Sequence, residues 1–394
     1  MAQTVTAARG AVLMPPPAEA VLSYAAGQTV KAAEALWPAA VIRLGEVAPS
    51  VTSYVQRVEV DGRPLFAKVS ILGVSLVSVL RGVCGDWESV KAAQAAYAAS
   101  PGSLLRREVL QLKTLAGPAR LRVPKVAGYA SGVLFTEPVT GPSLADLILR
   151  EPHRTADLLG RVVDELATGL RRPGVAARVD RAPIGERSIS GTFLRKFNGI
   201  SGSSYVNQTG HGDVLTAVAS RLRKAKIAPA PNQRVIFGDL KPEHAHFPDG
   251  PDGPVAFLDP GLQRGRPCAD AAKLMSRTVL NLVCCPPTPH DARAVLSGIA
   301  AFVAALNARV DEADRDAWLR QLVLLWLMDT TNILSTYLTA PPGLPLSAHG
   351  AAVVTRAGAV CQMLEHASAT MASRTPARTW WRLCLDDALM AVSA

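Results

Sequence analysis

The sequence predicts an α+β protein with two lobes, a small β-rich lobe followed by a larger and mainly helical lobe. Three observations support this fold class. The chain has 394 residues, which is more than a single hydrophobic core usually organises. Runs rich in β-branched residues lie before residue 70, whereas apolar residues recur at helical spacing through most of the chain after residue 140.

The small lobe should occupy residues 41–139, after an N-terminal helical extension over residues 1–40. β-Branched and aromatic residues predict three strands in its first part, and a turn at Asp61 and Gly62 joins the last two. The predicted strands are 41–44, 54–60 and 65–69. This arrangement places Lys68 on the third strand.

A helix is expected over residues 104–115, where apolar residues recur at helical spacing around Glu108. A lysine on the third strand needs a carboxylate that fixes its long side chain, and a helix can supply one. Glu108 is the candidate partner of Lys68, and Glu88 is its rival. If Glu108 is the partner, residues 70–103 form a long insertion.

The larger lobe should occupy residues 140–394 and consist of helices with one strand hairpin between them. The periodicity of apolar residues predicts where the long helices lie. They are expected at 156–170, 212–225, 292–308, 316–337 and 352–365.

Two carboxylates with the spacing of a phosphoryl-transfer site give the strongest functional signal. The apolar run 235–237 delivers Asp239 at a strand end, Pro242 stiffens the loop after it, and a turn at 248–253 leads through a hairpin to Asp259. Phosphoryl transfer uses one carboxylate to orient the acceptor hydroxyl and another to hold the divalent ion on the nucleotide phosphates. Asp239 suits the first task and Asp259 the second, so both are expected to face one cleft.

A second Gly-Asp pair in the chain does not share this context. His211, Gly212 and Asp213 are followed by a helical pattern without a proline, a hairpin or a second aspartate. We therefore expect Asp213 to begin a helix rather than to take part in catalysis.

The segment around Asp239 resembles the aminoglycoside phosphotransferase and choline kinase family. The signature of that family is His-Gly-Asp, four further residues and an Asn, with a metal-binding Asp about twenty residues further on. Phe237, Gly238, Asp239 and His244 stand at the first four of these positions, and Asp259 stands at the last. The resemblance covers roughly residues 41 to 275 and implies a bilobal protein-kinase-like fold.

The resemblance also implies roles for individual residues. Asp239 would position and deprotonate an acceptor hydroxyl, and Asp259 would bind Mg²⁺, or Mn²⁺. Lys68 would orient the phosphates of ATP, or of GTP. The helix that contains Glu108 is similar to the family helix before a Val-Pro pair, which favours Glu108 over Glu88 as the partner of Lys68.

Adenine contacts are implied at the hinge between the lobes, through the Glu137 carbonyl and the Val139 amide. Pro138 between them has no amide to donate. No glycine-rich loop precedes the second strand, and the candidate phosphate donors there are Ser50, Thr52 and Ser53.

Two departures from the family signature bear on the mechanism. Phe237 replaces the usual histidine and keeps only an apolar body that can pack beneath the loop. His244 replaces the usual asparagine, and three readings stay open: it binds metal and favours Mn²⁺, it orients the loop or a phosphate, or it marks a loss of activity. Asp270 either braces the catalytic loop or is an ordinary carboxylate at a helix N-terminus.

Composition narrows the class of partner. The net charge is +10, but the basic residues are dispersed and only 5% of residues are aromatic, so an anionic small ligand such as ATP is favoured over nucleic acid. The six cysteines show no metal-ligand spacing and are expected to be reduced. No signal peptide or uninterrupted membrane-spanning run is apparent, which predicts a cytoplasmic protein that binds no membrane.

The sequence thus predicts an ATP-dependent small-molecule O-phosphotransferase. Its acceptor is expected to be an antibiotic, an amino sugar or another secondary metabolite, in self-resistance or biosynthesis. The alternative is an inactive kinase-fold protein that binds nucleotide and regulates. A protein kinase is disfavoured, because the chain lacks a glycine-rich loop and an Ala-Pro-Glu element after Asp259.

Overall fold

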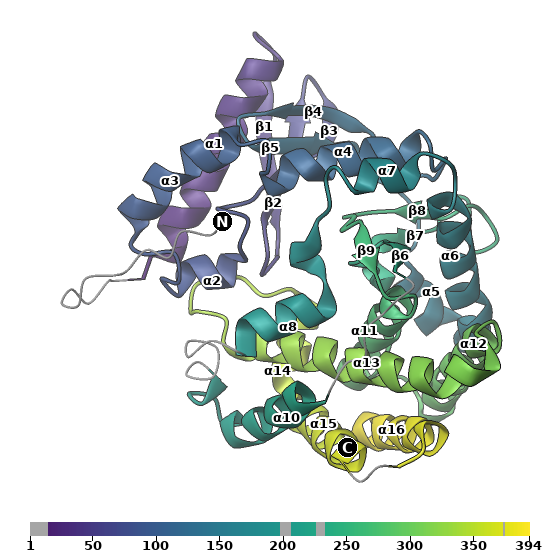
Figure 1. The fold of residues 1–394 in the computed structure, drawn as a ribbon. Coiled ribbons are helices and arrows are strands. Elements are labelled where there is room, and N and C mark those ends of the chain that lie inside the picture. The colour runs from purple at the N-terminus through teal and green to yellow at the C-terminus, as the bar shows by residue number, and fades with distance from the viewer. Residues whose placement is uncertain (1–14, 198–205, 226–232, 373–374) are drawn as a thin grey trace.

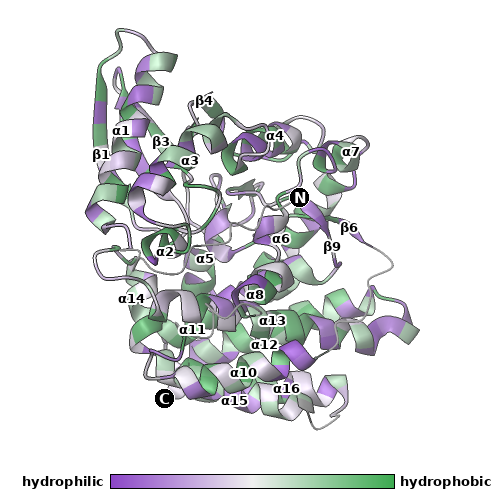
Figure 2. Cartoon of the chain, turned by 60° about the vertical axis from the view of Figure 1, so that its left-hand side comes forward, coloured by the Kyte–Doolittle hydropathy of each residue, from purple (hydrophilic) through white to green (hydrophobic). Residues whose placement is uncertain are grey.

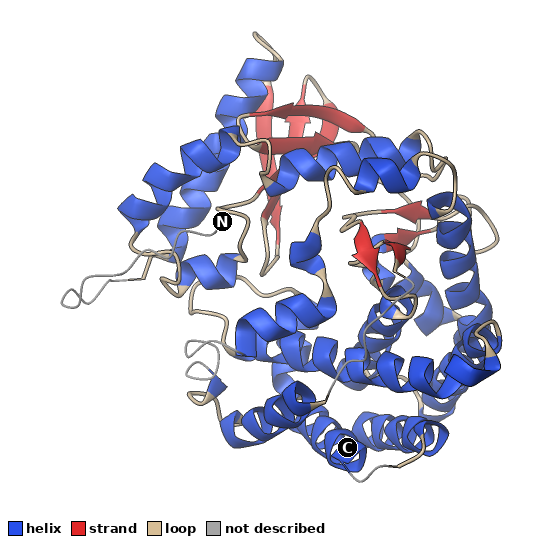
Figure 3. Ribbon diagram, viewed as in Figure 1, coloured by secondary structure: helices blue, strands red, loops and turns tan. Residues whose placement is uncertain are grey.

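The computed structural model describes residues 15–197, 206–225, 233–372 and 375–394. A five-stranded antiparallel sheet with flanking helices forms the smaller lobe, and a larger set of helices lies beside it (Figures 1 and 3). The predicted α+β fold with a small β-rich lobe and a larger helical lobe is confirmed.

The sheet of the smaller lobe has the strand order β1-β2-β3-β5-β4, with every neighbouring pair antiparallel. Its strands are β1 (Ile42–Ala48), β2 (Tyr54–Val60), β3 (Arg63–Val69), β4 (Val126–Ala130) and β5 (Val133–Thr136). Lys68 lies on the central strand β3, where it pairs with Val55 on one side and Leu134 on the other. Buried strands on both sides therefore fix the direction in which Lys68 extends.

The helices of this lobe are α1 (Ala18–Leu36), α2 (Leu76–Leu80), α3 (Trp87–Ala99) and α4 (Leu104–Ala116). Helix α1 contributes small buried side chains to the same core as β2, β3 and β5, so the N-terminal extension packs on the sheet. Helix α4 packs Leu105, Val109 and Leu112 against Leu134 of β5. This packing brings the buried face of α4 next to the strand that carries Lys68.

The predicted insertion over residues 70–103 folds into α2 and α3. Residues of α2 share a hydrophobic cluster with Val21 of α1 and with Leu344 of the larger lobe. The insertion therefore contacts both α1 of the smaller lobe and the connection between α13 and α14 of the larger lobe.

The larger lobe consists of helices that carry both hydrophobic and hydrophilic segments, as amphipathic packing requires (Figure 2). Its helices are α5 (Leu144–Arg150), α6 (Thr155–Leu170), α7 (Val175–Val179), α8 (Ile189–Phe197), α10 (Gly212–Lys224), α11 (Ala269–Cys284), α12 (Pro289–Ala308), α13 (Arg315–Leu338), α14 (Ala348–Thr355), α15 (Ala357–Ala372) and α16 (Ala377–Ser393). Helices α11 and α13 pack against each other at the centre, and most of their side chains are buried.

Strands β6 to β9 form two short two-stranded sheets (Figure 1). A β-bridge between Ala256 and Arg122 joins one of them to the smaller lobe. Strands β7 (Ala245–His246) and β8 (Ala256–Phe257) form the predicted hairpin. Strand β6 (Arg234–Ile236) pairs with β9 (Gln263–Gly265), and this second pairing was not predicted. The strand before Asp239 was expected from its apolar run, whereas β9 is too short and too polar to be recognised before its partner is known.

The helix predicted at 352–365 is wrong as a continuous element, because the structure has α14 and α15 with a break at Arg356. The Arg356 guanidinium donates hydrogen bonds to the carbonyls of Val283, Ala391 and Val392. These partners come from distant segments, so the break follows from tertiary contacts. The predicted division of the chain at residues 41 and 140 stays a prediction, and residues 1–14 lie outside the described residues.

One helix among the described residues, α12, is long and apolar enough to cross a membrane by length and composition. A third of its apolar window is buried in this structure. Its buried side chains, which include Val295, Ile299 and Phe302, belong to the main hydrophobic core, and the helix packs against α6. Helix α12 therefore packs one face against the other helices of the larger lobe.

Candidate functional site

The loop after β6 is held from below by a carboxylate of helix α11. Asp270 accepts hydrogen bonds from the backbone N–H groups of Phe237, at 2.8 Å, and Gly238, at 2.7 Å. The Phe237 ring is fully buried and lies against Phe257, with ring centroids 5.8 Å apart. Of the two roles considered for Asp270, the structure shows the loop brace, and Phe237 packs beneath the loop as expected.

Asp239 follows Gly238 and is nearly buried, with two ammonium groups in contact. Lys241 lies 3.0 Å from one carboxylate oxygen, and Lys273 of α11 lies 2.9 Å from the other. Burial opposes ionisation of Asp239, but these two lysines hold its pKa well below the usual range. Asp239 is therefore ionised at neutral pH.

Lys273 is also in contact with a second buried carboxylate. Its ammonium lies 3.1 Å from Asp329 of α13, and Arg277 donates to the same carboxylate at 2.7 Å. The hydroxyl of Ser276 donates a further hydrogen bond to Asp329 at 3.0 Å. The loop that carries Asp239 is thus connected through Lys273 to a buried polar network between α11 and α13.

Asp259 lies at the end of the β7–β8 hairpin in a left-handed backbone conformation, with φ of 55°. The Lys68 ammonium lies 2.5 Å from its Oδ1 atom. Burial opposes ionisation of Asp259, but Lys68 holds its pKa far below the usual range. A non-glycine residue at positive φ is uncommon and recurs at functional sites.

Lys68 is held from the other side by Glu108 of α4. The two carboxylate oxygens of Glu108 lie 3.0 and 3.1 Å from the Lys68 ammonium, and both side chains are buried. Glu88, the rival, is exposed on α3 and pairs with Lys91. The structure therefore brings Lys68 together with Glu108 and not with Glu88.

Arg187, in the segment before α8, joins this pair to the Asp259 loop. Its guanidinium donates to Glu108 at 2.7 Å and to the backbone carbonyls of Asp259 and Pro260, at 2.9 and 2.6 Å. Five N–H donors in a planar fork suit arginine to such a junction. Strand β3, helix α4 and the Asp259 loop thus form one connected network.

His244 lies between the two aspartates of the predicted pair. Its Nδ1 atom is 3.0 Å from the carbonyl oxygen of Asp239, which can only accept, so Nδ1 carries a proton and donates it. The Nε2 atom then has its lone pair free and lies 3.8 Å from Asp259. Burial and the nearby Lys241 lower the pKa of His244 to about 4, which keeps the ring neutral at neutral pH.

The predicted nucleotide contacts lie in the smaller lobe and in its connection to α5. Glu137 and Val139 follow β5 in the connection to α5, and the Glu137 side chain pairs with Arg63 and Lys125 of the same lobe. The Ser50 hydroxyl accepts from the backbone N–H groups of Thr52 and Ser53, both at 3.3 Å. These two amides are therefore bound to Ser50 in this structure, and Ser53 itself is buried.

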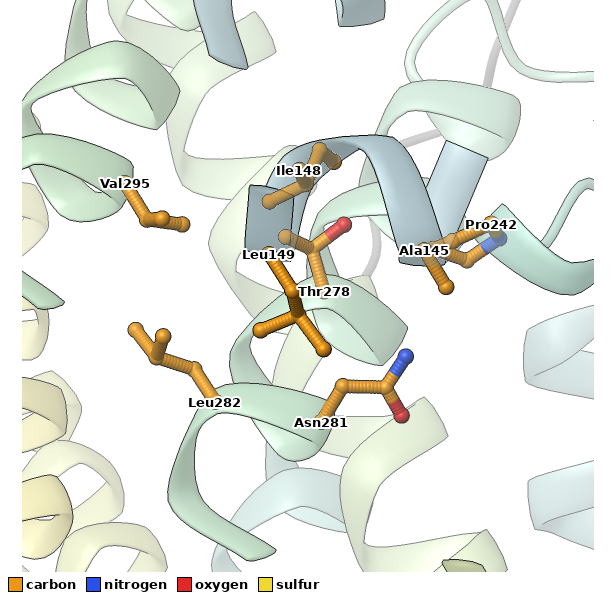
Figure 4. Close-up of a pocket in the computed structure, with 8 residues that line it drawn as sticks. All are labelled: Ala145, Ile148, Leu149, Pro242, Thr278, Asn281, Leu282 and Val295. Carbon is orange, nitrogen blue, oxygen red and sulfur yellow. The ribbon is translucent and has the colours of Figure 1, made fainter. Parts of the chain in front are cut away.

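Pro242 lies in the loop that carries Asp239, three residues after this aspartate. It borders a small, mainly apolar pocket between α5, α11 and α12 (Figure 4). The pocket is lined by Ala145, Ile148, Leu149, Pro242, Thr278, Asn281, Leu282 and Val295. Its lining contains no ionisable side chain, so this pocket does not belong to the charged network.

Five residues of this network were not assigned a role from the sequence: Arg187, Lys241, Lys273, Arg277 and Asp329. Lys241 stands two residues after Asp239, and its proximity in sequence was an available signal. Asp329 directly follows the apolar run 322–328 of α13, which is a signal of a paired buried charge. Asp213 lies in the first turn of α10, as predicted.

Comparisons with known proteins bear on the fold. No family model matches the sequence, and no curated protein matches it. The structure of a point mutant of aminoglycoside 2′-phosphotransferase-IIIa with GDP is 14% identical, with a TM-score of 0.51, over 86% of this chain and 96% of that chain. The GDP and kanamycin complex of APH(2″)-IIIa is 14% identical, with a TM-score of 0.50, over 86% of this chain and 98% of that chain.

The fold and the network together define a bilobal kinase-like protein. Within that class, the chain has the fold of the aminoglycoside phosphotransferases to which its Asp239 segment was found similar. The expected resemblance is therefore confirmed for the fold.

Proposed function

We propose that this protein is an ATP-dependent O-phosphotransferase that moves the γ-phosphate to a hydroxyl group of a small molecule. One observation carries the proposal: Glu108, Lys68 and Asp259 form a continuous ion-paired chain, and one histidine separates its end from Asp239. A phosphate-orienting lysine, a metal-binding carboxylate and a carboxylate for the acceptor hydroxyl are the parts that phosphoryl transfer needs.

The reaction assigns a separate task to each aspartate. The acceptor hydroxyl donates a hydrogen bond to Asp239, attacks the γ-phosphorus through its oxygen and gives up its proton, while the bond to the β-phosphate oxygen breaks and ADP leaves. Because the pKa of Asp239 is low, this carboxylate orients the hydroxyl and takes its proton late, once the new P–O bond is forming. Lys68, braced by Glu108, contacts the α- and β-phosphates.

A divalent ion fits beside Asp259. The Nε2 lone pair of His244 and the Asp259 carboxylate face the same space, although the described residues contain no group of three His, Cys, Asp or Glu side chains around one point. These two residues would hold the ion, and nucleotide phosphates and water would complete its coordination. When bound, the ion would neutralise charge on the transferred phosphate. An imidazole ligand suits Mn²⁺ better than Mg²⁺.

We place the acceptor among hydroxylated antibiotics, amino sugars and other secondary metabolites, with GTP as an alternative donor. The fold neighbours whose structures contain GDP, one of them with kanamycin, motivate this choice. In this proposal Glu137 and Val139 bind the nucleotide base, Ser50 and Ser53 lie near its phosphates, and the reaction takes place in the cytoplasm.

A second candidate function is a nucleotide-binding regulatory protein without transfer activity. It is motivated by Phe237 and His244, which replace the histidine and asparagine of the family signature. Nucleotide binding would survive these replacements, because Lys68 and Glu108 are intact.

The proposal is tested by measuring ATP and GTP consumption with Mg²⁺ and then Mn²⁺ against a panel of hydroxylated antibiotics and sugars. Asp239→Ala should lower acceptor-dependent turnover by about 10²- to 10⁴-fold while the nucleotide dissociation constant stays within a few fold. Nucleotide binding without turnover on any acceptor would favour the regulatory protein. Absence of nucleotide binding would contradict both functions.

A further inference from the structure

One lysine near the network has no carboxylate partner. Lys196, near the end of α8, donates hydrogen bonds to the backbone oxygen of Asn332 at 3.0 Å and to the Thr336 hydroxyl at 2.8 Å, both on α13. Among the described residues, it takes part in no ion pair with Asp or Glu. The undescribed stretches contain no Asp or Glu. The charge of Lys196 is therefore not neutralised by a carboxylate of this chain.

The position of Lys196 is unfavourable for a cation in the absence of an anion. Burial lowers its pKa well below the usual range, and the nearby Arg81 guanidinium lowers it further. Arg81 itself donates to the Thr339 carbonyl at the end of α13. The C-terminal carbonyls of a helix attract cations, but only weakly compared with the cost of desolvating an ammonium group. The side chain of Lys196 is still partly exposed, so a ligand can reach it.

Lys196 lies above the same face of α13 as the network around Asp239. Thr336 follows Asp329 by seven residues, which places the two side chains two turns apart on one face of the helix. At a rise of about 1.5 Å per residue, that separation is about 10 Å along the axis. Asp329 contacts Lys273, which contacts Asp239. These contacts place Lys196 about 10 Å along α13 from the carboxylate that shares Lys273 with Asp239.

The carboxylates near Asp239 are already paired with other cations. Asp239 contacts Lys241 and Lys273, Asp329 contacts Lys273 and Arg277, and Asp259 contacts Lys68. The acidic residues 311–316 lie at the opposite end of α13, at least 13 residues or about 20 Å from Asp329. They cannot neutralise a cation at Thr336.

We propose that the acceptor carries an anionic group, such as a carboxylate, sulfate or phosphate, which pairs with Lys196 while the acceptor hydroxyl lies at Asp239. This inference rests on the proposed phosphotransfer function and narrows its substrate class to acidic hydroxylated compounds. An acceptor whose only charges are positive would meet like charge at Lys196 and Arg81.

The experiment compares three sugars that differ in charge: glucuronate, glucose and glucosamine. Their dissociation constants are measured by calorimetry or ligand-observed NMR, with the nucleotide site saturated by a non-hydrolysable ATP analogue and Mg²⁺. We expect glucuronate to bind at least about tenfold more tightly than glucosamine, because an ammonium–carboxylate pair forms in a desolvated position. Lys196→Met should abolish this preference and Lys196→Arg should retain it.

Matched controls separate this result from a general loss of structure. Lys113→Met, on the exposed side of α4, removes the same charge elsewhere and should leave the preference unchanged. The melting temperatures of Lys196→Met and Lys113→Met are compared with that of the wild type, so that the binding of each sugar is measured on folded protein. Equal binding of the three sugars, no measurable binding of any, tighter binding of glucosamine, or a preference that survives in Lys196→Met would overturn the proposal.

The same samples distinguish this inference from the proposed function. Anion-selective binding that depends on Lys196, without phosphate transfer, would support the anion subsite and count against the transferase. Transfer to neutral or cationic acceptors without any preference for an anion would support the transferase and overturn the subsite.

Discussion

Asp329 is a single buried carboxylate that holds two cations next to Asp239. Its side chain is 1% exposed, and it contacts both Lys273 and Arg277. Burial alone would raise the pKa of Asp329, but Arg277 and Lys273 lower it to about 2. Lys273 and Arg277 would otherwise be buried without sufficient compensation, so this carboxylate stabilises the floor of the site.

The lowered pKa of Asp329 predicts a defined loss of stability in acid. In the unfolded chain an aspartate protonates near pH 3.9, so the stabilisation from Asp329 is complete above about pH 4 and is lost as the pH falls towards 2. This contribution is about 3 kcal/mol. Asp329→Asn should lower the free energy of unfolding by about 3 kcal/mol at pH 7, and the difference from wild type should shrink below pH 4.

Urea unfolding followed by circular dichroism at several pH values measures this effect. Asp386→Asn, an exposed aspartate of α16, serves as the control and should match wild type throughout. A difference between Asp329→Asn and wild type that stays constant from pH 7 to pH 2.5 would show that Asp329 does not titrate as described.

The sequence predicted the Lys68–Glu108 ion pair but not the Arg277–Asp329 ion pair. Lys68 and Glu108 are 40 residues apart. They were paired because Lys68 was placed on the third strand and the helix of Glu108 is similar to the family helix before a Val-Pro pair. Arg277 and Asp329 are 52 residues apart on two apolar helices. A charged residue in such a helix indicates a buried partner, but its identity depends on how the two helices are rotated against each other.

At the scale of elements, the turn from β6 into the loop that carries Asp239 depends on a glycine. Gly238 has a φ of 82°, and a Cβ atom there would lie 2.2 Å from the carbonyl oxygen of Gly261. Both the backbone conformation and the close approach exclude a side chain. The pairing of β6 with β9 brings Gly261 to this position.

Gly238→Ala should therefore distort the loop that carries Asp239. We expect a loss of at least about 2 kcal/mol in the free energy of unfolding, from the strained φ and the steric overlap. Gly160→Ala in α6 is a suitable control, because a Cβ there meets no atom within 4 Å and alanine is the better helix former, so it should stabilise by up to about 1 kcal/mol. Chemical denaturation of both variants checks the prediction, which fails if Gly238→Ala unfolds like wild type.

Elements with strong local signals were predicted close to their observed bounds. The hairpin of β2 and β3 has alternating residues and a turn with two residues at positive φ, Asp61 and Gly62. The break at Arg356 and the pairing of β6 with β9 had no such signal, because carbonyls and strands from distant segments create them.

At the scale of the whole molecule, Arg187 joins parts that lie in different lobes. It contacts the carboxylate of Glu108 on α4 and the backbone of the Asp259 loop, so the Lys68–Glu108 pair is held at a fixed place relative to Asp259. Nearby Glu108 and Asp259 raise the pKa of Arg187 despite its burial, which keeps the guanidinium charged.

Arg187→Met should loosen this junction. We expect nucleotide affinity to fall about tenfold, because Lys68 and Asp259 must then be brought into place by binding itself. Arg178→Met, at an exposed position of α7, is the control and should bind nucleotide like wild type. Calorimetric titration of both variants with ATP and Mg²⁺ measures the difference. An unchanged dissociation constant in Arg187→Met would show that Arg187 does not preorganise the site.

The sequence by itself determined the two-lobed α+β fold, the strand that carries Lys68 and the predicted pair of Asp239 and Asp259. These features follow from local periodicity, turn chemistry and spacing, which act over short stretches of chain. Only the tertiary structure decided which cations surround Asp239, that Arg187 joins the lobes and that Lys196 lacks a carboxylate. Charge balance in a buried site is set by side chains that meet from distant helices, and no local pattern specifies those meetings.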